Sequence, residues 1–156
     1  MLKVIDSDHE MREFGQAIGS VLGGGEVIEL IGDVGSGKTT LTKGIGLGLD
    51  VTDSVQSPSF TINRVYSARD DLELAHYDFY RLDDSGIMSD ELSEAINRPD
   101  AVTVIEWGGL VDGVLPDDRL TIRFVSPSET TRQVEVIATG DSSRQVLGKL
   151  SDDSAA

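Results

Sequence analysis

A glycine-rich octapeptide, Gly32–Thr39, constrains the fold of this chain more than any other feature. It reads Gly-Asp-Val-Gly-Ser-Gly-Lys-Thr, fits the pattern Gly-x-x-x-x-Gly-Lys-[Ser/Thr], and follows the apolar run Val27–Ile31. Glycines let backbone N–H groups turn towards phosphate oxygens, and the helix after such a loop presents its positive N-terminus to them. Lys38 is predicted to neutralise the β- and γ-phosphates, and the Thr39 hydroxyl to bind Mg²⁺. The octapeptide therefore predicts a nucleoside triphosphate site between a strand and a helix.

Length and composition narrow the class of protein. The chain has 156 residues, the length of one ordinary domain, and it has no cysteine, which excludes disulfide frameworks, thiolate nucleophiles and cysteine-based zinc sites. We expect a single domain over residues 1–150 and a disordered polar tail over residues 151–156. The first residues lack an apolar core of signal-peptide length, and no later window approaches the length of a transmembrane helix. We therefore expect a soluble, cytoplasmic protein without membrane contact.

The formal net charge of −15 limits the partners of the chain. A surface this acidic repels polyphosphates, so direct RNA or DNA binding by this chain alone is not expected. The acidity serves either solubility or the docking of a basic partner protein, and composition does not separate these two roles. ATP binding remains compatible with the charge, because a phosphate loop supplies local N–H dipoles, a lysine and a metal ion.

The apolar patterns predict an α/β domain with a mixed central sheet. Near-continuous apolar runs at residues 27–31 and 101–105 indicate strands that are buried on both faces. Helical periodicity indicates one helix before the first of these runs and another after the phosphate loop. Alternating patterns predict two antiparallel hairpins, at residues 60–77 and 119–138, and Asp141 is predicted to cap a last helix.

Two strand-end carboxylates are candidates for the metal site that a phosphate loop needs. Glu106 ends the apolar run Val102–Ile105, and Asp78 ends the more polar run Leu72–Tyr77. An ordinary strand-end role is the alternative for each of them. His76 precedes Asp78 by two residues, so their side chains share one face of an extended strand. We predict a supporting hydrogen bond from His76 to the Asp78 region, with proton transfer as the alternative.

Two other classes of phosphate-loop protein fit the sequence less well. The tetrapeptide Asn97-Arg98-Pro99-Asp100 superficially resembles the guanine-reading Asn-Lys-x-Asp element, but it follows no apolar strand and has arginine in place of lysine. A small-molecule kinase generally needs a mobile lid with arginines over the transferred phosphate. Residues 83–100, where a lid would lie, contain Arg98 as their only arginine.

Four sequence blocks together resemble the TsaE (YjeE) family of small bacterial ATPases required for threonylcarbamoyladenosine synthesis on tRNA. They occur in the order and spacing of the family: Gly32 to Thr40, Ser57-Pro58-Ser59-Phe60-Thr61, His76-Tyr77-Asp78-Phe79-Tyr80-Arg81-Leu82 and Glu106-Trp107. The His-x-Asp-x-Tyr-Arg block is the most specific of the four. The resemblance extends from the first predicted helix to the final hairpin, and it implies a P-loop NTPase-like, three-layer domain around the mixed sheet.

The resemblance implies ATP and Mg²⁺ as the cofactors. It places Mg²⁺ between Thr39 and Glu106, and the implied catalytic residues are Lys38, Asp78 and Glu106. Asp78 is implied to orient the attacking water or the water shell of the metal. The implied ATP-binding residues are Asp8, Asp33, Val34, Gly35, Ser36, Gly37, Lys38, Thr39, Thr40 and Arg132, of which Asp8 and Arg132 are expected to approach the adenine.

The resemblance also assigns a switch-like loop to the block Ser57–Thr61. This loop is implied to sense the γ-phosphate, and Arg81 to brace it. Ser59 stands where the family commonly has threonine, and both residues provide a hydroxyl group. The loop over residues 126–131 lacks the glycine expected before Arg132, which leaves the register of Arg132 open.

The implied function is that of a Mg²⁺-dependent ATPase in the bacterial tRNA N6-threonylcarbamoyladenosine modification machinery. Such an enzyme is slow alone and is stimulated by TsaD- and TsaB-type partner proteins, which would hold the tRNA in place of this acidic chain. Two alternatives remain open. One is a small-molecule kinase, and the other is a nucleotide-gated binding module without significant turnover.

Overall fold

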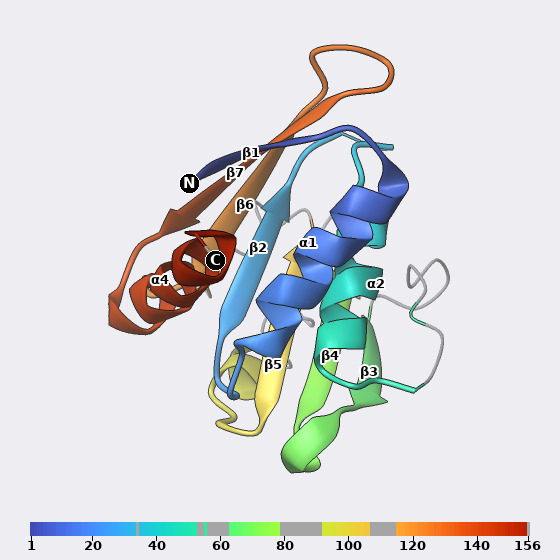
Figure 1. The fold of residues 1–156 in the computed structure, drawn as a ribbon. Coiled ribbons are helices and arrows are strands. Elements are labelled where there is room, and N and C mark those ends of the chain that lie inside the picture. The colour runs from blue at the N-terminus through green and yellow to red at the C-terminus, as the bar shows by residue number, and fades with distance from the viewer. Residues whose placement is uncertain (34, 53–54, 56–62, 79–91, 107–114, 156) are drawn as a thin grey trace.

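A seven-stranded sheet forms the centre of the molecule, with strands in the order β1-β7-β6-β2-β5-β4-β3 (Figure 1). The structure, a computed structural model, describes residues 1–33, 35–52, 55, 63–78, 92–106 and 115–155, with side chains up to residue 150. The parallel strands are β2 (Val27–Ile31), β4 (Glu73–Asp78), β5 (Ala101–Glu106) and β6 (Leu120–Val125). The strands antiparallel to their neighbours are β1 (Leu2–Ile5), β3 (Asn63–Ser67) and β7 (Arg132–Ala138). The predicted mixed sheet is confirmed.

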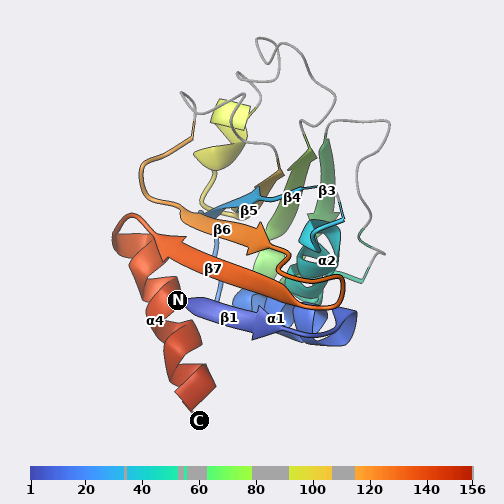
Figure 2. The same ribbon diagram turned by 90° about the horizontal axis from the view of Figure 1, so that it is seen from above.

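Helices cover both faces of the sheet. α1 (Asp8–Ser20) and α2 (Lys38–Gly48) lie side by side over one face, and the short helical segment 92–96 lies over the other (Figures 1 and 2). The core under α1 and α2 includes Ile28, Leu30, Leu41, Ile45, Val102 and Val104. The core on the opposite face comprises Val27, Ala75, Tyr77, Leu92, Ile105 and Leu115. This is the three-layer arrangement that the sequence predicted, and burial on both faces explains the continuous apolar runs of β2 and β5.

The two predicted hairpins are present where the structure describes them. β3 and β4 pair around a short 3-10 turn, η1 (Arg69–Asp71), and β6 pairs with β7 over the whole length of β6. Residues 60–62 of the first predicted hairpin lie outside the described residues.

Glycines bring the backbones of α1 and α2 into direct contact. A Cβ atom on Gly15 would lie 2.9 Å from the Cα atom of Gly44, and a Cβ atom on Gly19 would lie 3.0 Å from the Cα atom of Gly48. Real Cβ atoms essentially never approach another heavy atom closer than 3.0 Å. The four glycines therefore hold α1 close against the helix that follows the phosphate loop, a contact that the apolar periodicity does not predict.

The last helix, α4 (Asp141–Ala155), is longer than the sequence predicted. It continues through residues 151–155, where a disordered tail was expected, because this stretch contains no glycine or proline to end it. Its N-terminal cap also differs from the prediction. The Asp118 carboxylate accepts hydrogen bonds from the backbone N–H groups of Ser142 and Ser143, at 2.9 and 3.0 Å, whereas Asp141 forms an ion pair with Arg144.

Candidate functional site

The phosphate loop connects the carboxyl end of β2 to the first residue of α2, which is the order of strand, loop and helix that the motif requires. Gly35 and Gly37 have φ angles of +81° and +108°, in the left-handed region that glycine adopts without steric cost. A Cβ atom on Gly37 would also lie 2.8 Å from the Cε atom of Met11, so α1 packs directly against the loop. Val34 lies outside the described residues.

The N-terminus of α2 is suited to bind an anion. Its N-cap, Gly37, has no side chain, and no side-chain hydrogen bond caps this helix among the described residues. α1, in contrast, is capped by the hydroxyl group of Ser7, which accepts from the N–H of Glu10 at 3.1 Å. Unpaired N–H groups and the positive end of a helix dipole together attract phosphate. The buried hydroxyl group of Ser36 has no hydrogen-bond partner among the described residues, so the loop fits a polar ligand.

Lys38 lies at the centre of this site. Its side chain is 6% exposed, and Nζ donates a hydrogen bond of 2.5 Å to the carbonyl oxygen of Gly32. Burial lowers the pKa of Lys38, and the negative charges of Glu106, Asp78 and Asp33 oppose that shift. The ammonium group is therefore held at the loop within the electric field of three carboxylates.

Asp78 and Glu106 lie next to each other at the carboxyl ends of β4 and β5. They are register partners, and Glu106 is in turn the register partner of Leu30, two residues before the loop. Register partners in parallel strands point to the same face, which here is the face covered by α1 and α2. The two predicted strand-end carboxylates thus converge on the face and the edge of the sheet where Lys38 and Thr39 begin α2.

His76 contacts Glu106, which corrects the predicted hydrogen bond to the Asp78 region. The Nε2 atom of His76 lies 3.2 Å from Oε2 of Glu106, and both side chains are almost completely buried. The register partner of His76 is Val104, so Glu106 lies two residues further along β5. The glutamate side chain is long enough to reach back to the imidazole across this offset, which a prediction from β4 alone does not include.

α1 and β7 both begin at the edge of the sheet where β2 ends and the phosphate loop follows, near the top of Figure 1. Asp8 begins α1, and Arg132 begins β7 opposite Ile5. The hydroxyl group of Thr131 donates a hydrogen bond of 3.4 Å to Asp6, which joins the β6–β7 loop to the start of α1. The guanidinium group of Arg132 donates to carbonyl oxygens of its own loop, those of Ser128, Glu129 and Thr131. The approach of Asp8 and Arg132 to an adenine stays a prediction.

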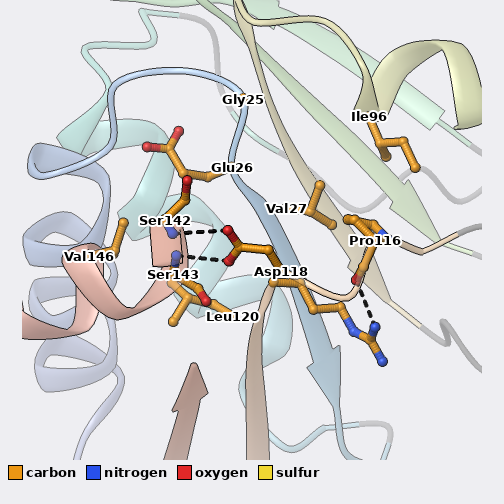
Figure 3. A pocket seen from close by; sticks show the side chains of 11 residues that line it. Gly25, Glu26, Val27, Ile96, Pro116, Asp118, Leu120, Ser142, Ser143 and Val146 are labelled. Carbon is orange, nitrogen blue, oxygen red and sulfur yellow. Dashed lines mark hydrogen bonds between the residues drawn. The ribbon is translucent and has the colours of Figure 1, made fainter. Parts of the chain in front are cut away.

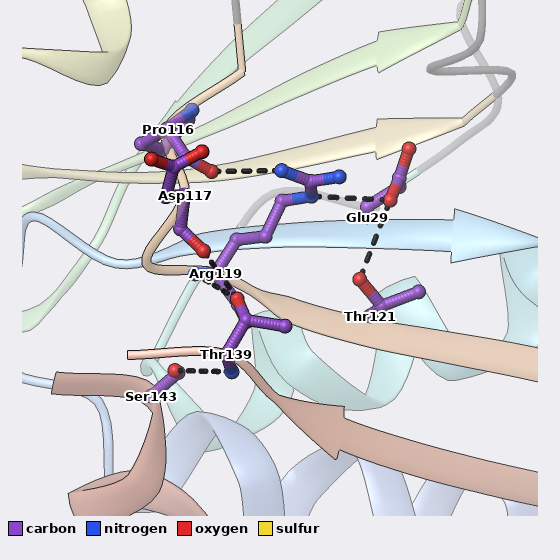
Figure 4. A network of polar contacts seen from close by, with 7 residues as sticks. All are labelled: Glu29, Pro116, Asp117, Arg119, Thr121, Thr139 and Ser143. Atoms are coloured by element: carbon purple, nitrogen blue, oxygen red, sulfur yellow. Dashed lines mark hydrogen bonds and ion pairs between the residues drawn. The ribbon is translucent and has the colours of Figure 1, made fainter. Parts of the chain in front are cut away.

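Glu29 forms a buried polar network that the sequence analysis did not predict (Figure 4). Its Oε1 atom accepts a hydrogen bond of 3.2 Å from Nε of Arg119 and one of 3.3 Å from the hydroxyl group of Thr121. Nη1 of Arg119 also donates to the carbonyl oxygen of Pro116 at 2.8 Å. Glu29 lies on β2 and points to the face opposite to Lys38, so the network fixes the strand before the loop against β6. A charged residue inside an otherwise apolar run is the signal that could have revealed it.

A pocket lies at the other end of the sheet, between the start of β2, the loop before β6 and the start of α4 (Figure 3). Its lining includes Val27, Asp118, Arg119 and Val146 but none of the predicted nucleotide-binding residues. Asp118 in this pocket already caps α4, as the dashed lines in Figure 3 show. The N-terminus of α4 at this pocket is therefore already capped, unlike the N-terminus of α2 at the phosphate loop.

Replacing Asp118 by alanine is expected to lower the free energy of unfolding by about 1 kcal/mol, the usual cost of losing a helix cap. Burial raises the pKa of Asp118, but the hydrogen bonds from Ser143 and Ser142 outweigh burial and bring the pKa below its ordinary value of 3.8. A carboxyl group whose pKa is lower in the folded state stabilises the fold at pH values above its pKa in the unfolded state. This stabilisation is lost as the pH falls through the folded-state pKa. Urea unfolding at several pH values measures the effect. The difference in the free energy of unfolding between Asp118→Ala and the unaltered protein should become smaller below pH 3.8. Asp117→Ala, an exposed neighbour, is the control, and an equal loss there would contradict the capping role.

The helices that the structure describes include none that is both long enough and apolar enough to cross a membrane.

Comparison with known proteins identifies the family. The family model described as Threonylcarbamoyl adenosine biosynthesis protein TsaE matches residues 5–134. The chain belongs to the TsaE family. A Streptomyces coelicolor protein named tRNA threonylcarbamoyladenosine biosynthesis protein TsaE is 41% identical over 115 residues, which are 73% of this chain and 78% of that protein. A Bacillus subtilis protein of the same name is 36% identical over 128 residues, which are 81% of this chain and 78% of that protein.

The crystal structure of Bacillus subtilis YdiB supports the fold of this TsaE family member. It aligns with a TM-score of 0.81 and 28% sequence identity, over 99% of this chain and 95% of that one. The fold therefore agrees with a solved structure over almost the whole length, and the recognition of the TsaE family from four sequence blocks is confirmed.

Several residues that the TsaE resemblance singled out lie outside the described residues. These are the block Ser57–Thr61, Arg81 and Trp107. The described part of the chain contains no group of three or more histidine, aspartate or glutamate side chains that could hold a metal ion. Mg²⁺ usually binds proteins through one or two side chains and completes its shell with water and substrate phosphates. A magnesium site formed by Thr39 and Glu106 fits that chemistry and remains a prediction.

Proposed function

We propose that this chain is the ATP-binding and ATP-hydrolysing component of the bacterial tRNA N6-threonylcarbamoyladenosine modification machinery. One observation carries the ATPase part of the proposal. The uncapped N-terminus of α2, the buried Lys38 and the neighbouring carboxylates of Asp78 and Glu106 lie at one edge of the sheet. Membership of the TsaE family supports the role in tRNA modification.

The proposed reaction is the in-line attack of a water molecule on the γ-phosphate of ATP. Backbone N–H groups of the loop, from Asp33 to Thr40, bind the phosphate oxygens, and the ammonium group of Lys38 stabilises the charge that develops on them. Thr39 and Glu106 would hold Mg²⁺, which when bound supplies a Lewis acid at the phosphate oxygens. Asp78, beside Glu106, orients the attacking water or the water shell of the metal.

TsaD- and TsaB-type proteins are the proposed partners, and the cytoplasm the proposed location. In this division of work the partners hold the tRNA, because the net charge of −15 on this chain opposes direct contact with a nucleic-acid backbone. Alone the chain hydrolyses ATP slowly, and the partners complete or regulate its site. Turnover resets the partner enzyme between rounds of modification.

Replacing Asp78 by asparagine is expected to lower the partner-stimulated rate of phosphate release by about 100-fold, the scale of losing a group that orients the nucleophile. ATP binding should persist, because the phosphate loop and Lys38 are unchanged. Phosphate release from Mg²⁺-ATP is measured for the chain alone, for the chain with a TsaB–TsaD preparation, and for the variant with that preparation. Asp70→Asn, which makes the same change in η1, between β3 and β4, is the matched control.

Three results would contradict the proposal. Transfer of phosphate to an acceptor molecule would indicate a small-molecule kinase. Tight ATP binding that changes partner affinity, with no loss in Asp78→Asn, would indicate a nucleotide-gated module without significant turnover. Equal losses in Asp78→Asn and Asp70→Asn would show that the charge of the protein, and not the position of Asp78, matters.

A further inference from the structure

The buried pair of His76 and Glu106 connects two parallel strands at the edge of the proposed nucleotide site. The His76 side chain is completely buried, and that of Glu106 is 3% exposed. Nε2 of His76 lies 3.2 Å from Oε2 of Glu106. The other imidazole nitrogen, Nδ1, is buried without a hydrogen-bond partner among the described residues.

The chemistry of this contact assigns the proton of the imidazole. An ionised carboxylate only accepts hydrogen bonds, so Nε2 must carry the proton that is donated to Glu106. A proton on Nδ1 would be a buried N–H without a partner, which costs more than a buried lone pair. The geometry therefore places a proton on Nε2, directed at one oxygen of the Glu106 carboxylate.

A second charge competes for the same carboxylate. Glu106 is the largest of the three carboxylate influences on Lys38, whose ammonium group is held at the loop. Without a partner on β4, the Glu106 carboxylate would be drawn towards that ammonium, and neither group would remain available for metal or phosphate. The hydrogen bond from His76 keeps Oε2 in place and leaves Oε1 for another ligand.

We propose that His76 is a positioning residue that orients Glu106 towards Mg²⁺ in the nucleotide complex. This inference rests on the proposed Mg²⁺-ATP site. Partners that orient a metal-binding side chain typically change metal affinity by about 10- to 100-fold when they are removed. A histidine that merely filled the core would change stability but not the magnesium requirement of nucleotide binding.

Replacing His76 by leucine is expected to raise the Mg²⁺ concentration for half-maximal nucleotide binding by about 10-fold or more. The affinity for nucleotide in EDTA should stay unchanged, because the phosphate loop is intact. The measurement is a titration of ADP binding by calorimetry at Mg²⁺ concentrations from micromolar to millimolar. His76→Gln should recover most of the wild-type requirement, because its amide group can donate at the position of Nε2. His76→Asn should not, because its side chain is too short to reach Oε2.

Thr103→Val is the matched control for a buried polar group. Thr103 is almost completely buried on β5, its hydroxyl group has no partner among the described residues, and it points to the face opposite to Glu106. Its removal should leave the magnesium requirement unchanged. If His76→Leu does not fold, the comparison of His76→Gln with His76→Asn decides the inference.

Two outcomes would overturn the proposals separately. The positioning role of His76 would be contradicted if His76→Leu needed the same Mg²⁺ concentration as the unaltered protein. It would also be contradicted if His76→Gln and His76→Asn needed equal concentrations. Either result would leave the proposed nucleotide site intact. An unaltered protein whose nucleotide affinity does not depend on Mg²⁺ would contradict the proposed Mg²⁺-ATP site itself, and the inference with it.

Discussion

Replacing Lys38 by alanine is expected to lower the affinity for Mg²⁺-ATP by about 100-fold or more, which is the scale of removing a charged donor from a phosphate site. The side chain is almost completely buried, and its ammonium group is bonded to the loop itself. Its loss removes the positive charge on which Glu106, Asp78 and Asp33 act, so their negative charges then repel the phosphates of ATP more strongly. Calorimetric titration of ATP, together with the rise in melting temperature caused by ATP, measures the effect.

Lys43→Ala is the matched control for Lys38→Ala. It removes the same charge from the same helix, five residues further on and outside the phosphate loop. Its expected affinity is within a few-fold of the unaltered protein, because an exposed or half-exposed charge at this distance is screened by salt. Unchanged ATP affinity in Lys38→Ala, in a protein that still melts cooperatively, would contradict the assignment of the phosphate loop.

Local sequence patterns predict the elements of this fold but not the order of its strands. The apolar runs at residues 27–31 and 101–105 predict buried strands, which are present as β2 and β5. The same patterns do not show that β6 pairs with the other side of β2, or that β1 pairs with β7. Strand order depends on contacts between residues far apart in the chain, and these leave no periodic signal within either segment.

The candidate site shows the same limit on a smaller scale. The carboxyl ends of neighbouring parallel strands meet at one edge, so the convergence of Asp78 and Glu106 near the phosphate loop follows from the sequence. The partner of His76 does not, because it depends on the register between β4 and β5. The pair of Glu29 and Arg119 was missed for a similar reason, since 90 residues separate them.

The contact between α1 and α2 was also missed, although its glycines are visible in the sequence. Gly15 and Gly19 are four residues apart, as are Gly44 and Gly48, which places each pair on one helical face. Apolar periodicity assigns no position to glycine, so the helices were predicted from their larger side chains alone. Close packing of two backbones needs glycine, the residue type that such patterns ignore, because it requires the absence of a Cβ atom.

Replacing Gly44 by alanine is expected to lower the free energy of unfolding by up to about 2 kcal/mol. The new Cβ atom would press against the carbonyl oxygen of Arg12 and lie 2.9 Å from the Cα atom of Gly15. Both are backbone atoms, so α1 and α2 must move apart, and overpacking of this kind typically costs about 1–3 kcal/mol. The intrinsic preference of alanine for helix recovers only about 1 kcal/mol. Urea unfolding followed by circular dichroism gives the change.

Gly148→Ala tests whether the loss comes from the helix contact. Gly148 lies within α4, and a Cβ atom placed on it meets no atom within 4 Å. The same substitution should therefore raise the free energy of unfolding, by about 0.5–1 kcal/mol, through helix propensity and the lower entropy of the unfolded chain. If the free energy of unfolding falls in Gly44→Ala and rises in Gly148→Ala, the loss at Gly44 comes from the contact between the backbones of α1 and α2. A stabilising Gly44→Ala would show that the two helices can separate without cost, and that their close approach does not hold α1 against the phosphate loop.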